Sequence, residues 1–450
     1  MHMRLLTDRW LSLAALLWSF AVALVISSVV HAGPQGSGVR PSVNAPKAGH
    51  VDPNHPLFEF APEDGTGMGA VCSCATPTDK SGTAITFTRA SSGTCLKGNT
   101  LTGIENGDLV TCTTNQARVM PGGDGTGGLG LLVEGARTNN TPRSQEFDHA
   151  AWTSDQSGVA APVVTANVAT APDGTLTADR LQVPATTGSQ YSQIYQGSGC
   201  VTASATSASI FLKAHNGASA GTLDLCIQNP GTFCKACPFN PTTWTRCTLS
   251  GGVESVIIIG SNAVYGAGSG ALGAAADVDL WGAQCEDAAS SSSYIPTTTV
   301  AVTRALDVAT FDVGSSINRT GSAAATIVSA NNSLSAASLI SVAGTSLTYL
   351  SIGQLTSGQA YIFDGTTIVN TTAGSNFASP HRFWSSWNAA DAFSMTATND
   401  TDSKTASGAF DGDMQGGTTT VSLGGENSGA GWVYGTIKRV CIDTSTTRCR

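Results

Sequence analysis

Short apolar runs separated by turn residues are the feature of this sequence that most limits its fold. Val256-Ile-Ile-Ile259 and Leu223-Asp-Leu-Cys-Ile227 are typical runs, and turn sequences such as Pro172-Asp173-Gly174 and Asn229-Pro230-Gly231 stand between them. Runs of this length that are rich in β-branched residues and bounded by Gly, Pro and Asn predict strands. No helical periodicity intervenes, so we expect an all-β chain of β-sandwich domains, of jelly-roll or concanavalin A-like type.

The first 32 residues have the order of a secretory signal peptide. Arg4 and Arg9 precede an apolar run from Leu11 to Val30, and Val30-His31-Ala32 places small residues where a cleavage site needs them. The alternative is an uncleaved anchor helix, because about 20 apolar residues can span a bilayer. We favour cleavage, which predicts a secreted, extracellular or cell-surface protein with no membrane attachment of its own.

The rest of the chain divides by composition into four parts. Residues 33–56 are a Gly-, Pro- and Ser-rich linker, and residues 57–128 form a small β-rich region. Residues 129–311 and 322–450 each carry a regular series of strand-like runs, which predicts two sandwiches. Within the β-rich region, Asn106-Gly107 predicts a hairpin turn between arms at 101–104 and 108–113, because both turn residues tolerate positive φ.

The charge of the chain excludes one class of partner. It has 31 acidic and 22 basic residues, a formal net charge of −9. An acidic chain without a basic stripe repels phosphates, so nucleic-acid binding is disfavoured.

An even number of cysteines behind an export signal favours disulfides. There are twelve, and the predicted bridges are Cys95–Cys112, Cys226–Cys247 and Cys441–Cys449. Cys234-Lys-Ala-Cys237 has the spacing of zinc ligands, but no second pair of cysteines or histidines accompanies it, so we expect these two cysteines to form bridges as well.

A set of phrases in the middle region resembles a module of phage tail and fibre proteins. The resemblance covers about 180 residues and implies a jelly roll of the carbohydrate-binding-module type. The matching phrases are Leu129-Gly-Leu-Leu-Val-Glu-Gly-Ala-Arg-Thr-Asn-Asn140, Ser144-Gln-Glu-Phe-Asp-His-Ala-Ala-Trp152, Ala171-Pro-Asp-Gly-Thr-Leu-Thr-Ala-Asp-Arg-Leu181, Tyr294-Ile-Pro-Thr-Thr-Thr299 and Val302-Thr-Arg-Ala-Leu-Asp-Val308.

The last third is similar to concanavalin A-like and laminin-G-like lectin sandwiches. His381-Arg-Phe-Trp-Ser-Ser-Trp387 and Tyr434-Gly-Thr-Ile-Lys-Arg-Val440 carry this second resemblance. Phage virion proteins usually lack a signal peptide, and this chain is richer in cysteine than the pattern. A prophage-derived bacterial surface protein fits both departures.

Two acidic motifs imitate functional sites. Asp277, Asp279 and Glu286 imitate the paired carboxylates of glucanases, but they lie in the segment that resembles the non-catalytic module. We therefore expect no catalytic residues and no enzyme activity. Asp411-Gly-Asp413 is a weak candidate for calcium binding, although a solvated loop is the favoured interpretation. We expect no cofactor other than this calcium candidate.

Sugar recognition needs aromatic faces flanked by hydrogen-bonding side chains. Tyr191, Gln193 and Tyr195 are two residues apart, so in a strand they share one face of a sheet. The alternative is that these tyrosines cover the edge of a core. Trp384, Trp387 and Trp432 are further candidates, whereas Trp152, Trp244 and Trp281 are expected in the core.

The leading hypothesis is a non-catalytic surface or phage-tail-like protein that binds a cell-surface polysaccharide or another surface partner. One alternative is a purely structural virion or surface component whose partner is another virion or surface protein. A second is a secreted glycan hydrolase. The sequence leaves the oligomeric state open, a trimer included.

Overall fold

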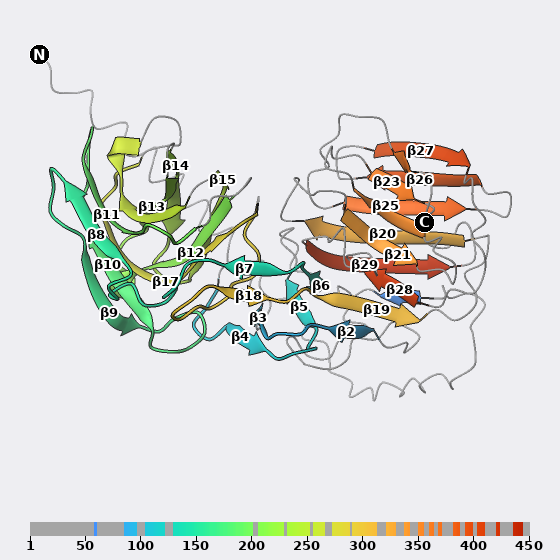
Figure 1. The fold of residues 1–450 in the computed structure, drawn as a ribbon, viewed down its shortest axis with the longest axis horizontal. Coiled ribbons are helices and arrows are strands. Elements are labelled where there is room, and N and C mark those ends of the chain that lie inside the picture. Colours follow the sequence, from blue (N-terminus) through green and yellow to red (C-terminus); the bar gives the residue numbers. More distant parts are fainter. Residues whose placement is uncertain are drawn as a thin grey trace, which may run out of the picture. The chain divides into compact units, whose positions relative to one another are not determined.

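The structure is a computed structural model of 450 residues, shown in Figure 1. It divides into two units, Met1–His50 and Val51–Arg450. It describes the second unit at residues 85–96, 104–121, 129–200, 206–228, 232–252, 255–265, 272–288 and 290–312, together with the backbone of the strand at 58–60 and of strands between 321 and 443. The predicted signal peptide, the linker and Cys72 and Cys74 lie outside the described residues.

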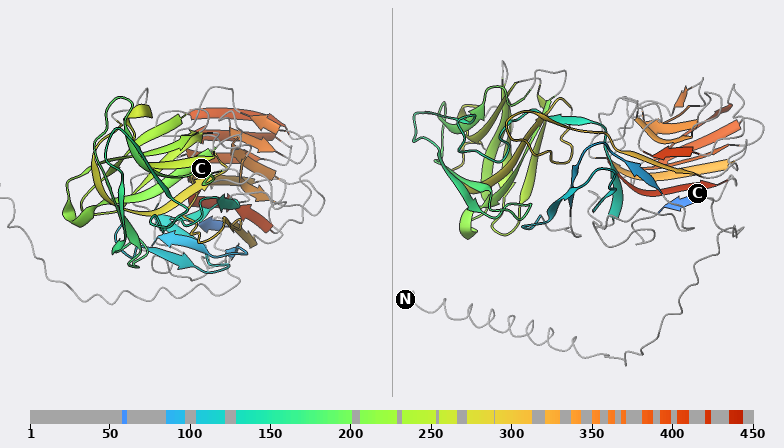
Figure 2. Two further views of the ribbon diagram at one scale, coloured as in Figure 1. Left: turned by 60° about the vertical axis from the view of Figure 1, so that its left-hand side comes forward. Right: turned by 60° about the horizontal axis from the view of Figure 1, so that its bottom comes forward.

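The described chain is all-β, built from antiparallel sheets, which confirms the predicted fold class (Figures 1 and 2). Two five-stranded sheets form the jelly roll of the middle region. The β12 sheet has the order β15-β12-β17-β10-β9, and the β11 sheet has the order β14-β13-β16-β11-β8. Their strands are β8 (Thr153–Ser157), β9 (Val163–Ala169), β10 (Ala178–Val183), β11 (Tyr191–Gln196), β12 (Thr206–Ala214), β13 (Gly221–Gln228), β14 (Thr232–Phe239), β15 (Thr245–Gly252), β16 (Val256–Ser261) and β17 (Ala276–Glu286).

Side chains that alternate between the two faces of each strand form the core between these two sheets. Leu223 and Leu225 of β13 and Ile259 of β16 are buried on the inner face of the β11 sheet, and Ile210 and Leu280 face them from the β12 sheet. Because successive strand residues point to opposite faces, the residues between them face outward. Burying each such side chain contributes roughly 1.5–3 kcal/mol.

A second apolar cluster covers the outer face of the β12 sheet. It contains Trp244, Trp281 and Tyr294, together with Leu96 and Leu109 from the N-terminal region. Trp244 and Trp281 are 1% exposed and Trp152 is 5% exposed, which confirms that these three tryptophans are core residues.

The N-terminal region pairs differently from its prediction. The turn at Asn106-Gly107 is present, and Gly107 has a φ of 85°. However, β4 (Leu109–Cys112) pairs with β3 (Gly93–Leu96), and Ile104 forms an isolated bridge with Trp244. The described part of the predicted hairpin thus pairs with more distant segments, residues 101–103 of its first arm lie outside the described residues, and the predicted disulfide Cys95–Cys112 fixes the β3–β4 pair.

Three further disulfides lie in the jelly roll. They are Cys200–Cys285, Cys226–Cys234 and Cys237–Cys247. The predicted bridge Cys226–Cys247 was wrong, because Cys226 lies directly opposite Cys234 in the β13–β14 ladder, with 4.1 Å between their Cα atoms. Disulfide formation also removes Cys234 and Cys237 as zinc ligands. Cys449 lies outside the described residues, and for Cys441 only the backbone is described, so Cys441–Cys449 stays a prediction.

The C-terminal strands form two larger sheets that also take in strands from earlier in the chain. β5 and β6 pair into the sheet of β29, while β2 and β19 pair into the sheet of β28. The predicted boundaries near residues 128 and 311 therefore do not coincide with the division between sheets. The strands are β1 (Phe58–Phe60), β2 (Thr86–Thr88), β5 (Arg118–Pro121), β6 (Leu129–Val133), β19 (Val308–Asp312), β20 (Gly321–Ser329), β21 (Ala337–Val342), β22 (Leu350–Gln354), β23 (Ala360–Phe363), β24 (Ile368–Asn370), β25 (His381–Trp387), β26 (Ala392–Thr398), β27 (Ser403–Ala409), β28 (Thr420–Leu423) and β29 (Gly435–Asp443).

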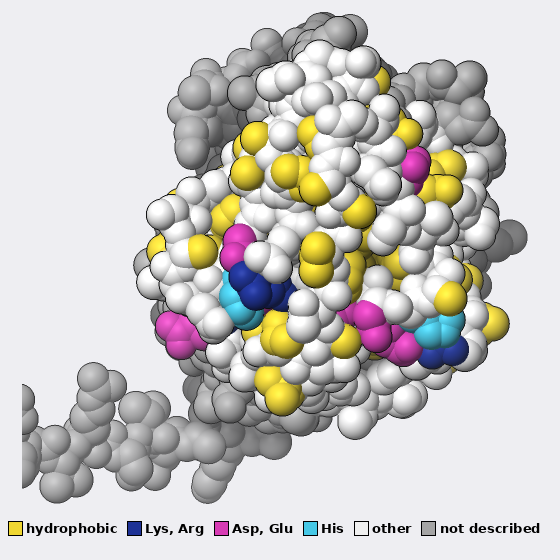
Figure 3. Space-filling model, turned by 90° about the vertical axis from the view of Figure 1, so that its left-hand side faces the viewer, with side chains coloured by type: hydrophobic (Ala, Val, Ile, Leu, Met, Phe, Trp, Pro, Cys, Tyr) yellow, Lys and Arg dark blue, Asp and Glu magenta, His cyan; other side chains and the backbone are white. Residues whose placement is uncertain are grey.

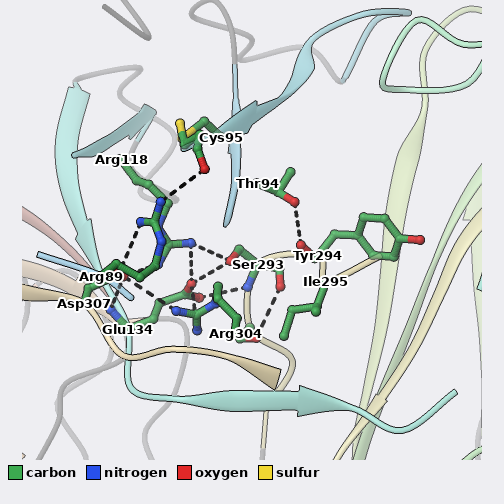
Figure 4. Close-up of polar contacts among 12 residues, drawn as sticks. Arg89, Thr94, Cys95, Arg118, Glu134, Ser293, Tyr294, Ile295, Arg304 and Asp307 are labelled. Carbon is green, nitrogen blue, oxygen red and sulfur yellow. Dashed lines mark hydrogen bonds and ion pairs between the residues drawn. A yellow bond between two sulfur atoms is a disulfide. The ribbon is translucent and has the colours of Figure 1, made fainter. Parts of the chain in front are cut away.

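A buried ionic cluster ties together the points where the chain enters and leaves the jelly roll (Figure 4). Asp307 binds Arg89 at 3.1 Å and also binds Arg118, while Glu134 binds Arg118 at 2.7 Å and Arg304 at 3.3 Å. The side chains of all five are at most 6% exposed. Burial alone would raise the pKa of Glu134, but the charges of Arg118 and Arg304 outweigh it and hold that pKa well below the ordinary value.

Removing Asp307 should destabilise the protein far more than removing an exposed carboxylate. Asp307→Ala leaves Arg89 and Arg118 buried without this partner, so we expect a loss of about 3–5 kcal/mol in the free energy of unfolding. Asp277→Ala is the matched control, because its partner Arg180 and Asp277 itself are 28% and 38% exposed; it should cost about 1 kcal/mol or less. Chemical denaturation of both variants measures the difference, and equal losses would contradict the structural role given to the cluster.

Candidate functional site

The three residues predicted for sugar recognition lie together on β11. Tyr191, Gln193 and Tyr195 alternate with Ser192 and Ile194, and Ile194 points into the core between the sheets. The three candidates therefore share the outer face of the β11 sheet, as their spacing predicted. β11 lies between β8 and β16, so residues from both neighbours flank this row.

The edge strand β8 supplies polar groups beside the two tyrosines. In the ladder, Thr153 lies opposite Tyr195, Asp155 opposite Gln193 and Ser157 opposite Tyr191. Tyr191, Tyr195 and Asp155 are half-buried, whereas Thr153 and Ser157 are exposed. We call these six residues the tyrosine face.

Gln193 differs from its neighbours because it is buried. It is 4% exposed, and its Oε1 has no hydrogen-bond partner. A buried acceptor without a donor is costly, because it has lost its hydrogen bonds to water and gained none within the protein.

Tyr195 is held in place by a small apolar cluster that includes a disulfide. Tyr195 packs against a cluster formed by Ile258, its neighbour on β16, and by the disulfide-bonded Cys226 and Cys234 on the two strands beyond. The covalent link between β13 and β14 thus supports one side of the tyrosine face.

Further unpaired polar atoms lie next to Gln193 across the sheet. Asp224 of β13 accepts hydrogen bonds through Oδ2 from the backbone N–H groups of Asn262 (2.8 Å) and Gly273 (2.9 Å). Its Oδ1 and both amide atoms of Asn262 are buried without partners. Burial raises the pKa of Asp224, and the two backbone donors offset only part of that rise.

Asp224, Asn262 and Asp155 were not among the residues predicted from the sequence. A signal for Asp224 exists, because an acidic residue inside Leu223-Asp-Leu-Cys-Ile227 must face away from the two leucines. No comparable signal marks Asn262, whose position depends on how the chain leaves β16.

The acidic residues that imitate a glucanase pair are engaged in structural contacts. Arg180 donates to both oxygens of Asp277, at 2.7 and 2.6 Å, and His215 lies 2.6 Å from Asp279. Glu286 is buried and accepts hydrogen bonds from Ser292 and from Gln284. The expectation that these carboxylates are not catalytic stays a prediction.

The remaining candidates fall where side chains are not described. Trp384 and Trp387 lie on β25, for which the backbone alone is described. Trp432, Asp411 and Asp413 lie outside the described residues. Among the side chains that are described, no group of three or more His, Cys, Asp or Glu residues is arranged to hold a metal. No helix in the described part of the chain is long and apolar enough to cross a membrane.

The surface on the side of β8 and β9 is mostly uncharged (Figure 3). Its charged side chains gather in a few small groups of mixed sign, with scattered apolar side chains between them.

Comparison with known proteins gives partial structural similarities. No protein-family model matches the sequence, and no curated protein matches it either. A CBM40 module of a Ruminococcus gnavus sialidase, bound to sialyllactose, is similar over 29% of this chain and 77% of its own, with 14% identity and a TM-score of 0.24.

Two further solved structures are similar over longer stretches. A tail fibre protein from an E. coli phage matches 70% of this chain and 41% of its own, at 8% identity and a TM-score of 0.20. Domains of the mouse laminin α1 chain match 53% of this chain and 80% of their own, at 9% identity and a TM-score of 0.19. These scores describe loose similarity between β-sandwiches, so the functional argument must come from the residues of this chain.

Gly260 sets how closely β11 and β16 approach beneath the tyrosine face. A Cβ at this position would lie 2.4 Å from the carbonyl oxygen of Ser192 and 2.6 Å from the Cα of Gln193. Gly260→Ala should therefore push the strands apart and cost about 1–3 kcal/mol of stability. Gly197→Ala, where no atom lies within 4 Å, is the control and should be close to neutral. Thermal unfolding of the two variants checks this, and the prediction fails if both unfold at the same temperature.

The buried carboxylate of Asp224 should make stability depend on pH. Because its folded-state pKa is raised above the ordinary 3.8, the folded state holds a proton that the unfolded state has released. The contribution of this group to the free energy of unfolding should thus fall as the pH rises from about 4 through the raised pKa. Asp224→Asn keeps an acceptor for the two backbone N–H groups and should flatten the curve over this range. Denaturation of both proteins at a series of pH values tests this, and parallel curves would contradict it.

Proposed function

We propose that this protein is a non-catalytic, exported surface protein that binds glycans through the tyrosine face of its jelly roll. The observation that carries the proposal is the placement of two half-exposed tyrosines on one sheet face, beside the accessible hydroxyl and carboxylate oxygens of the neighbouring strand β8. Sugar rings present C–H faces that pack on aromatic rings and hydroxyl groups that donate to such oxygens.

The surroundings of the tyrosines suit a ligand of this kind. Thr153, Asp155 and Ser157 line the neighbouring edge strand and offer hydroxyl and carboxylate groups at the rim. Tyr195 is supported from the other side by the Cys226–Cys234 disulfide and Ile258, so little conformational freedom is lost when a ring stacks on it. The four disulfides fit an extracellular setting, as the predicted signal peptide does.

A polysaccharide array tests the proposal with the protein as it exists after export. We expect the wild-type protein to bind at least one polysaccharide, Tyr195→Ala to weaken that binding about tenfold or more, and Tyr195→Phe to retain most of it. These expectations follow because the packing of a sugar C–H face on tyrosine depends on the aromatic ring and not on the hydroxyl group.

Phe233→Ala is the matched control, because Phe233 is 45% exposed on β14 and lies outside the tyrosine face. It should bind like the wild type, and circular dichroism should show that all variants are folded. Failure of the wild-type protein to bind any polysaccharide, or undiminished binding by a folded Tyr195→Ala variant, would count against the proposal.

A further inference from the structure

The charges on the outer face of the β11 sheet are all negative. The row that crosses the five strands through Gln193 consists of Asp155, Gln193, Gly260, Asp224 and Ala236. It contains two carboxylates and no basic residue.

The remaining outward positions of these five strands also lack basic residues. The five strands contain one basic residue, Lys235 of β14, and its side chain does not point outward. Lys235 alternates with the outward-facing Cys234 and Ala236, and its Nζ donates to the carbonyl oxygen of Thr248, 3.0 Å away. The positive charge of Lys235 is thus turned away from the tyrosine face.

The buried carboxylate on this face has no cation beside it. The hydrogen bonds of Asp224 come from two backbone N–H groups, and its Oδ1 is unpaired. Elsewhere in the described chain, Asp307 and Glu134 contact arginines and Asp277 contacts Arg180. A carboxylate that burial shields from water and no cation neutralises exerts its field further than an exposed one.

These charges determine which glycans can bind. Recognition of a carboxylate or sulfate group on a sugar relies on Arg or Lys, whose charge-assisted hydrogen bonds are roughly twice as strong as neutral ones. On the tyrosine face such a group would lie beside Asp155 and in the field of the buried Asp224, two strands from β11 in the same row, and none of the five described strands places a cation there to neutralise it. Hydroxyl groups, by contrast, can donate to the half-buried carboxylate of Asp155.

We infer that the tyrosine face selects glycans that carry no acidic groups and rejects uronic-acid-containing and sulfated polysaccharides. The inference rests on the proposed glycan-binding function and adds the class of ligand to it.

A pair of polymers that differ in charge alone gives the sharpest test. Uronic-acid-containing polysaccharides and their carboxyl-reduced counterparts have the same linkages, and both are spotted on one array with neutral polysaccharides at about 0.15 M salt, where the Debye length is about 8 Å. For any polymer bound through Tyr195, we expect the carboxyl-reduced form to bind about tenfold or more tightly than its acidic parent.

Reversing the charge at Asp155 should reduce the preference for carboxyl-reduced polymers over their acidic parents. Asp155→Lys places a cation beside the tyrosines and should reduce the ratio between reduced and acidic forms about threefold or more. Asp148→Lys makes the same change in net charge at an exposed residue outside the β11 sheet and should leave the ratio within about twofold of the wild type.

Each outcome separates the two proposals. Acidic polymers that bind as tightly as their reduced forms, with binding lost in Tyr195→Ala, would overturn the inference and leave the glycan-binding function standing. An equal effect of Asp155→Lys and Asp148→Lys would also overturn it, because the preference would then come from net charge. Absence of binding to any polymer on the array would overturn the glycan-binding function itself.

Discussion

The buried cluster of Asp307 and Glu134 with three arginines is the interaction on which the rest of the structure depends. Removing charges from water costs several kcal/mol each, and this cost is offset only where partners are close and additional hydrogen bonds are complete. Here Asp307 and Glu134 are each contacted by two or more guanidinium groups, and Ser293 donates to Glu134 through both its backbone N–H and its hydroxyl group. The cluster therefore fixes several distant segments at one place.

The tyrosine face differs from this ionic cluster, because polar atoms in it and next to it lack hydrogen-bond partners. Gln193 is buried between its two tyrosines with Oε1 unpaired, and Asp224 of β13 and its partner Asn262 carry further unpaired atoms. Gly260 allows β11 and β16 to approach closely, while Asp224 holds the backbone at Asn262 and Gly273. Buried polar atoms without partners cost stability, so this part of the β11 sheet is not optimised for stability alone.

The sequence predicted what depends on local alternation and missed what depends on distant partners. Tyr191, Gln193 and Tyr195 share a face because a strand repeats every two residues, and Trp152, Trp244 and Trp281 are buried as expected. The pairing of Cys226 was wrong, since two other cysteines follow within twelve residues and spacing cannot choose between them. Arg89 and Asp307 are 218 residues apart, and no local pattern could have joined them.

The topology around Glu134 and Asp307 has a consequence for how this protein can change over evolutionary time. The backbone N–H of Asp307 donates to the carbonyl oxygen of Glu134 at 2.8 Å, so the segment that leads into the jelly roll and the segment that leads out of it are neighbours. β6 and β19, just outside this point, belong to the sheets of the C-terminal strands. The jelly roll is thus an insertion with a closed base, and we expect that a recombination event there could exchange it for another inserted domain while both flanking strands keep their places.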